Sequence, residues 1–261
     1  MGLYKAEGVV LRTRSLGEAD KIVTFFTHAR GKVEAVAKGA RRPRSRLLGP
    51  TQQFTYGRYL FFEGKNLDTV SQGEILQSFR PLREDLDRMA YAAYAAELVD
   101  RSTEPGDRHE GLFPLLVAVL GLLAESDELP LVMRYFELRL LGELGYRPHL
   151  SGCTRCGAPR APYFSVELGG LVCERCLPAD VAATHIGDEA VHVLRYLERA
   201  EPGRLQVVRP SADALAALEA VLPRFCAARI GQPLHAMEFL LALRAGRGAR
   251  AANIDSDKPI C

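Results

Sequence analysis

The sequence lacks any hydrophobic run long enough to cross a membrane. Its longest apolar stretch covers residues 112–124, whereas a membrane-spanning helix needs about 20 residues. Near the start, Lys5 and Glu7 interrupt what would be the apolar core of a secretory signal, and Ala6 stands where a myristoylation signal has Ser or Thr. We therefore expect a cytoplasmic protein with no membrane partner, in which residues 112–124 form a buried helix.

The signatures of common enzyme classes are also absent. The chain has no G-x-x-x-x-G-K-[ST], G-x-G-x-x-G, H-E-x-x-H or G-x-S-x-G motif, and its six histidines are scattered. It has no acid cluster suited to holding Mg²⁺ beside a phosphate. We therefore expect a protein that is not an enzyme. A nuclease or another enzyme with a novel site is the alternative, and incubation with labelled DNA and Mg²⁺ would test it.

Charge is distributed unevenly along the chain. The formal net charge is only +2, but residues 1–80 hold 14 Lys and Arg against 7 Asp and Glu, and the remainder is net acidic. Residues 37–48, AKGARRPRSRLL, concentrate five cations without an acid: Lys38, Arg41, Arg42, Arg44 and Arg46. Such asymmetry is typical of a polyanion-binding module joined to a second part.

The N-terminal part has the pattern of a small β-barrel. Five runs rich in Val, Ile, Thr, Tyr and Phe are separated by Gly and polar residues, at 8–16, 20–29, 31–39, 54–64 and 68–79. Five short strands favour an oligonucleotide-binding fold (OB-fold) barrel over residues 1–80, and an SH3-like barrel is the alternative. The basic stretch would then connect the third and fourth strands.

From Pro81 the hydrophobic period changes to that of helices. One helical face would be shared by Leu82, Leu86, Met89, Ala93 and Leu98. Further helices are expected near 112–124, 129–144, 188–199, 212–230 and 234–245. We predict an α+β multidomain protein: the barrel, a helical domain formed by 81–147 and 181–245, an inserted segment at 148–180, and a flexible tail at 246–261.

The inserted segment carries two C-x2-C pairs separated by 16 residues: Cys153, Cys156, Cys173 and Cys176. Four thiolates from two knuckles are typical of a closed, structural zinc site, without the open position that a catalytic zinc needs. A disulfide framework does not suit a cytoplasmic chain, and a redox dithiol or coincidence is the alternative. His185 is expected to be solvated, Cys226 to be a small core residue, and Cys261 to lie in the tail.

The basic residues of the barrel are the candidate DNA contacts. Arginine forks suit phosphate, and the face of an OB-fold barrel commonly binds single strands. The predicted contacts are Arg12, Arg14, Lys32, Lys38, Arg41, Arg42, Arg44 and Arg46, with a solvated charged face as the alternative. About half of the neighbouring aromatic residues must enter the barrel core, and one or two could stack on bases.

Three motifs follow one another in residues 8–54. They are Gly17-Glu18-Ala19-Asp20, then Thr27 with Gly31-Lys32, then Lys38-Gly39-Ala40-Arg41-Arg42 with Ser45-Arg46. This order resembles the N-terminal signature of the RecO family of recombination mediators, in a form close to its Deinococcus-type members. The expected helices and the four-cysteine insert are similar to the layout of that family over nearly the whole chain.

The resemblance implies an OB-fold domain, a helical domain and a zinc finger. It also implies a nucleoid-associated protein that binds single- and double-stranded DNA, anneals complementary strands and, with RecR, helps RecA load onto DNA coated by single-strand-binding protein. That coat protein would be contacted through its acidic C-terminal tail. Arg134 and Arg139 are candidates for this contact, with solvated surface charges as the alternative. A zinc-containing RNA-binding or translation-associated module is the competing hypothesis.

Overall fold

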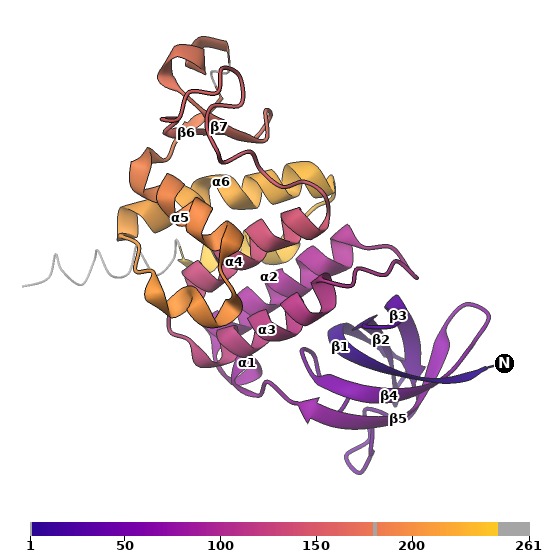
Figure 1. The fold of residues 1–261 in the computed structure, drawn as a ribbon. Coiled ribbons are helices and arrows are strands. Elements are labelled where there is room, and N and C mark those ends of the chain that lie inside the picture. The colour runs from indigo at the N-terminus through magenta and orange to yellow at the C-terminus, as the bar shows by residue number, and fades with distance from the viewer. Residues whose placement is uncertain (1, 180–181, 245–261) are drawn as a thin grey trace, which may run out of the picture.

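The computed structural model describes residues 2–179 and 182–244. Figure 1 shows the barrel at one end, a bundle of helices in the middle and the four-cysteine segment at the other end. Within the described residues, no helix is both long and apolar enough to span a bilayer. The predicted flexible tail at 246–261 and Cys261 lie outside them. The division into separate domains at the predicted boundaries stays a prediction.

Five strands close into a barrel with the order β1-β2-β3-β5-β4. They are β1 (Leu3–Leu16), β2 (Asp20–Thr27), β3 (Gly31–Ala37), β4 (Tyr56–Phe62) and β5 (Asp68–Gln77). The long strand β1 serves two neighbours, pairing with β4 through its first half and with β2 through its second half. Parallel pairing of β3 with β5 closes the barrel. The prediction of an OB-like barrel is confirmed.

Alternation along the strands gives the barrel two apolar faces. Val10 and Phe25 point into the barrel core. Their neighbours Val9, Leu11 and Phe26 point outward and belong to the core of the helical part. The barrel therefore packs against the helices through one side of its own wall, and the exposed sides are left for binding.

The barrel is held against the helices by ring packing and by a close backbone approach. Phe113 of α3 (Leu112–Glu125) packs its ring against those of Phe26 and Tyr56 on the barrel. At the turn between β2 and β3, Gly31 has a φ of 62°, and a Cβ there would lie 1.8 Å from the carbonyl oxygen of Asp107. Only glycine allows this approach of the hairpin to the loop before α3.

The helical part also contains α1 (Pro81–Glu84), α2 (Leu86–Ser102), α4 (Leu129–Glu143), α5 (Gly187–Arg199) and α6 (Ala212–Ile230), and residues 235–244 are helical. The expected single face across residues 82–98 is wrong in part, because Leu86 and Met89 are 44% and 37% exposed. The chain is extended at Asp85, whose side chain caps α2, so α2 starts afresh with a different buried face.

An ion pair lies inside the helical core, on the central helix α4. Arg134 Nε is 2.7 Å from Glu137 Oε2, and the Tyr94 hydroxyl donates a hydrogen bond to Glu137 Oε1. Burial is the main reason that the pKa of Glu137 is raised to about 7. Because Arg134 is only 3% exposed, it is neither a surface charge nor accessible to a peptide, and both interpretations made from the sequence are wrong.

The four-cysteine segment is a small folded unit joined to the bundle. It contains β6 (Tyr163–Ser165), β7 (Gly170–Val172), the short helix η1 (Glu174–Ala179) and β8 (Thr184–His185), with sheet order β7-β6-β8. Phe164 packs edge-on against Phe225 of α6, with 5.4 Å between ring centroids. Three short strands bury little apolar surface of their own, so the segment needs a further source of stability.

Candidate nucleic-acid interface and metal centre

The basic stretch lies in the loop between β3 and β4, and two apolar residues anchor this loop. Ala40 and Leu47 are buried in the barrel core on either side of the four arginines. The Thr51 hydroxyl donates a hydrogen bond to the Leu47 carbonyl oxygen at 2.6 Å. These anchors hold a segment that cannot form a helix or strand by itself, and they leave its charged side chains outside the barrel.

The loop is also hydrogen-bonded to the turn between β1 and β2. The Gly39 amide donates to Asp20 Oδ1 at 2.7 Å, and the Arg41 amide donates to the Ala19 carbonyl oxygen at 2.9 Å. The Arg41 guanidinium donates to the Gly17 carbonyl oxygen at 2.8 Å. Two motifs that lie about 20 residues apart in the sequence therefore form one structural unit, which presents the basic side chains in a fixed place.

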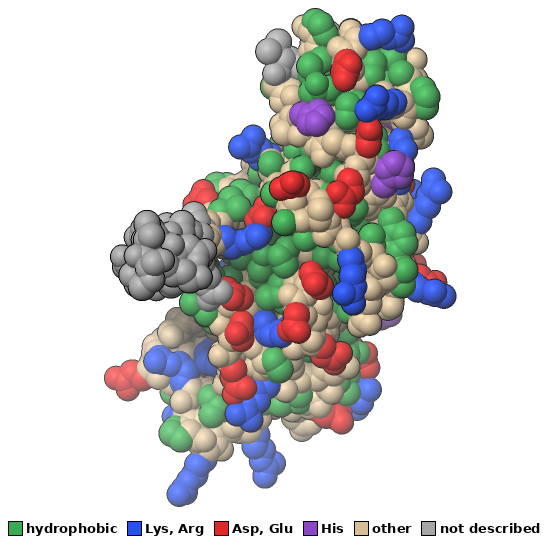
Figure 2. All heavy atoms as spheres, turned by 90° about the vertical axis from the view of Figure 1, so that its left-hand side faces the viewer, with side chains coloured by type: hydrophobic (Ala, Val, Ile, Leu, Met, Phe, Trp, Pro, Cys, Tyr) green, Lys and Arg blue, Asp and Glu red, His purple; other side chains and the backbone are tan. Residues whose placement is uncertain are grey.

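The five cations of this loop are exposed: Lys38, Arg41, Arg42, Arg44 and Arg46. None of them forms an ion pair with any residue of the described ranges 2–179 and 182–244. Burial and the nearby charge of Arg41 lower the pKa of Lys21, which shows how closely positive groups are placed here. Figure 2 shows Lys and Arg side chains projecting from the lower end of the molecule, where Figure 1 has the barrel.

The three predicted contacts on the strands have a different environment. Arg12 Nε donates to Asp100 Oδ2 of α2 at 2.8 Å, and Arg12 and Arg14 both approach Glu34. Lys32, only 14% exposed, lies 3.4 Å from the Asp100 carboxylate. Asp100 thus joins two barrel cations to the helical part. The sequence has no signal for this contact, because the partners are remote along the chain.

Most of the barrel aromatics are structural. Phe25, Tyr59 and Phe61 fill the barrel core, and Phe26 and Tyr56 pack toward Phe113. Phe62 at the end of β4 is 50% exposed. Of these six aromatic residues, Phe62 therefore has the most ring surface available for stacking on a base.

The four cysteines of the two C-x2-C pairs meet in space. Their Sγ atoms all lie within 4.8 Å of one another, and Cys156 Sγ is 3.5 Å from Cys173 Sγ. A tetrahedral site with metal–sulfur bonds of about 2.3 Å has sulfur–sulfur edges of about 3.8 Å. The arrangement could therefore hold one metal ion through four thiolates, with no position left for a water molecule.

The surroundings act unequally on the thiols of this site. Although burial acts to raise it, backbone amides of Cys156, Cys173 and Arg155 lower the pKa of Cys153 to about 6. Hydrogen bonding to Cys156 and burial raise the pKa of Cys176 to about 12. Arg175 Nη2 lies 4.0 Å from Cys156 Sγ, where its charge offsets that of a thiolate. Among the other candidates, His185 is exposed and stands outside the cluster, while Cys226 is buried in the core, as expected.

Comparison with known proteins agrees with these features. The family model "Recombination protein O N terminal" matches residues 1–79, and "Recombination protein O C terminal" matches residues 83–238. A protein named "DNA repair protein RecO" from Symbiobacterium thermophilum is 42% identical over 95% of this chain and all of its own length. A protein of the same name from Bacillus subtilis is 36% identical over 91% of this chain and 94% of its own. The chain belongs to the RecO family of DNA repair proteins.

Proposed function

We propose that this protein is a DNA-binding recombination mediator without catalytic activity, acting in the cytoplasm at the nucleoid. It binds single- and double-stranded DNA, anneals complementary strands and, with RecR, helps RecA load onto DNA coated by single-strand-binding protein. The single observation that carries the proposal is the anchored loop on an OB-like barrel, whose five exposed cations form no ion pair within the part of the chain that the structure describes. Membership of a DNA repair family supports it.

The mechanism is electrostatic. Lys38, Arg41, Arg42, Arg44 and Arg46 neutralise phosphates and release condensed counterions, which favours binding of any sequence. Two complementary strands repel each other through their phosphates, so a shared cationic surface lowers the cost of bringing them together. Base pairing then supplies the specificity, and the protein needs no base-reading contact for annealing.

Annealing of complementary oligonucleotides tests the function directly. We expect the protein to accelerate annealing of bare strands, and to accelerate annealing of strands coated with single-strand-binding protein, measured by fluorescence quenching between end labels. RNA strands of the same sequence form a parallel arm. A protein that leaves DNA annealing unchanged but binds RNA tightly would contradict the proposal in favour of the RNA-binding hypothesis.

We propose zinc as the metal of the four-cysteine site, in a structural role. Four thiolates favour zinc over oxygen-seeking cations such as Mg²⁺ and Ca²⁺, and a closed tetrahedral set is typical of structural zinc. The residues that would hold it are Cys153, Cys156, Cys173 and Cys176. Bound there, the ion would cross-link the two knuckles and stabilise a segment whose own sheet is small.

The acidic tail of the coat protein is the partner proposed for the helical part. A hollow of about 680 Å³ lies between α5 and the short helix η2 (Pro202–Val207). Three arginines and one acid line it, together with the exposed Val207: Arg195, Arg199, Arg204 and Glu201. Arg199 and Arg204 are not ion-paired within the described part of the chain. An excess of arginines beside apolar surface suits an acidic peptide with a free C-terminal carboxylate.

Replacing Arg199 and Arg204 together by alanine should weaken binding of such a peptide at least about tenfold, since each charge-assisted hydrogen bond contributes about 1.5–3 kcal/mol. Isothermal titration of the full chain with a short acidic peptide would measure this, with the same peptide amidated at its C-terminus as the control. Annealing of bare strands should not change. If wild-type protein does not bind the peptide, this partner must be dropped.

A further inference from the structure

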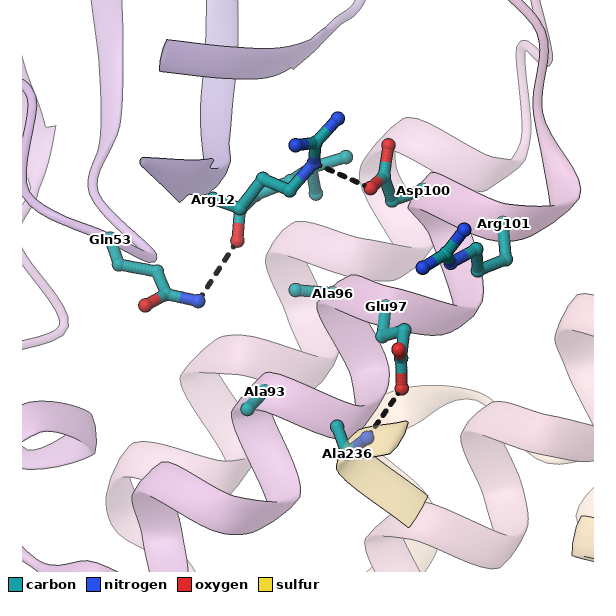
Figure 3. A pocket seen from close by; sticks show the side chains of 9 residues that line it. Arg12, Gln53, Ala93, Ala96, Glu97, Asp100, Arg101 and Ala236 are labelled. Atoms are coloured by element: carbon teal, nitrogen blue, oxygen red, sulfur yellow. Dashed lines mark hydrogen bonds and ion pairs between the residues drawn. The ribbon is translucent and has the colours of Figure 1, made fainter. Parts of the chain in front are cut away.

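A cavity of about 350 Å³ lies where the barrel, α2 and the helical residues 235–244 meet (Figure 3). Arg12 and Gln53 approach it from the barrel side, and Glu97, Asp100 and Arg101 face it from α2. Its volume lies at the small end of the range for ligand pockets. The proposed function does not use this cavity, although β1 leads to it.

The apolar part of the lining comes from three segments. Leu11 belongs to β1, Ala93 and Ala96 belong to α2, and Ala236 lies in the helical residues 235–244. Three alanines leave room where larger side chains would close the space. A planar group could therefore enter between these segments.

The walls carry two positive and two negative side chains, so the cavity has no net formal charge. The carboxylate of Glu97 accepts hydrogen bonds from the His235 and Ala236 amides, and that of Asp100 pairs with Arg12. A phosphate or an acidic peptide would gain little here, because these acids offset the arginines. A neutral ligand with both donors and acceptors suits such walls better.

Two polar side chains of the walls offer hydrogen bonds to the cavity. The Arg101 side chain lines one wall and donates to the Gln232 side chain at 3.5 Å. On the other side, Gln53 donates to the Leu11 carbonyl oxygen, so its own side-chain oxygen remains an acceptor. A ligand with a donor at its edge could therefore bind Gln53.

We propose that this cavity takes a single unstacked nucleobase from a bound DNA strand. The inference rests on the proposed function and adds a base-binding site to it. A nucleobase is neutral and planar, has donors and acceptors at its edge, and stacks on guanidinium planes such as that of Arg12.

The position of the cavity fits the path of a strand. β1 runs from the cavity at Leu11 to the turn at Gly17, a distance of about 20 Å at about 3.3 Å per residue. That turn is hydrogen-bonded to the basic loop. Arg14 lies between the two sites and is more than half exposed. A strand held by the loop can thus follow β1, with its phosphates on Arg14, and insert a base into the cavity.

Binding to two oligonucleotides of equal length tests this inference, one normal single strand and one in which every base is removed. Wild-type protein should prefer the normal strand about tenfold, because stacking of a base contributes about 1–3 kcal/mol. Ala93→Leu fills the cavity, since Ala93 is only partly buried. This variant should lose most of that preference and should keep wild-type affinity for the abasic strand and the wild-type salt slope.

Ala220→Leu on the exposed surface of α6 is the matched control and should behave as wild type. Gln53→Leu, which removes the acceptor in the wall, should also reduce the preference and serves if Ala93→Leu does not fold. A folded Ala93→Leu protein that keeps the preference for the normal strand would disprove the base site. Equal loss of affinity for both strands would disprove it too, and in both cases the proposal that the protein binds DNA would remain. If wild-type protein binds neither strand, the proposed function itself fails.

Discussion

Cys153→Ser should remove the metal and unfold the segment around residues 150–180. A closed four-thiolate site holds zinc with about 10–16 kcal/mol of apparent binding free energy at neutral pH in small domains, and this energy is coupled to folding. The segment has only three short strands to replace it. Metal analysis should give about one zinc per chain for wild type and little for the variant. Hydrogen exchange should show lost protection in this segment.

The damage should also reach the bundle. Phe164 packs against Phe225 of α6, so unfolding of the segment uncovers part of the helical core. DNA binding should survive, because the barrel lies at the opposite end of the molecule (Figure 1). Cys226→Ala, which removes a buried thiol outside the cluster, is the control and should retain the metal. Wild-type protein with no zinc and four freely reactive thiols would disprove the site.

Replacing the loop arginines Arg41, Arg42, Arg44 and Arg46 by alanine should weaken single-strand binding and make it less sensitive to salt. Between 50 and 200 mM salt, the affinity of the wild-type protein should fall roughly 50-fold more than that of the variant. Each phosphate contact contributes about 0.7 to the magnitude of the slope of log K against log salt. The loss of four contacts should therefore reduce that magnitude by roughly 3. The loss should be similar for all sequences, since phosphate contacts carry no base information. Fluorescence anisotropy at several salt concentrations would measure it.

The folded state should tolerate this change, because the anchors of the loop are Ala40 and Leu47 and the arginine side chains are exposed. A matched variant removes four exposed arginines outside the barrel, with the same change in net charge: Arg80, Arg147, Arg209 and Arg224. It should keep most of the salt slope. If the loop variant folds and its slope equals that of wild type, the loop is a solvated face, and the binding surface must lie on the strands.

Local sequence patterns carried much of the fold. The five strands were predictable because runs of β-branched and aromatic residues are separated at Gly17, Gly31 and Gly64. The long helix α6 (Ala212–Ile230) was predictable from the helical period of its apolar residues. The face predicted for α2 failed because one extended residue, Asp85, resets the helix. An interruption of one residue leaves no trace in an apolar period, so this error was not avoidable from the pattern alone.

The candidate sites divide in the same way. The sequence by itself determined the four-cysteine set and the basic loop, because both depend on residues close together in the chain: two C-x2-C knuckles, and five cations within nine residues.

Only the tertiary structure decided which cations are available to bind DNA. Arg12 and Lys32 pair with Asp100, a residue 88 positions after Arg12, whereas the loop arginines meet no acid in the described structure. Tertiary packing also decided that the charge of Arg134 is buried against Glu137. The cavity beside Arg12 likewise exists only because α2 packs across the barrel wall. Charge and residue type are local properties of a sequence, but exposure and pairing depend on packing between distant segments.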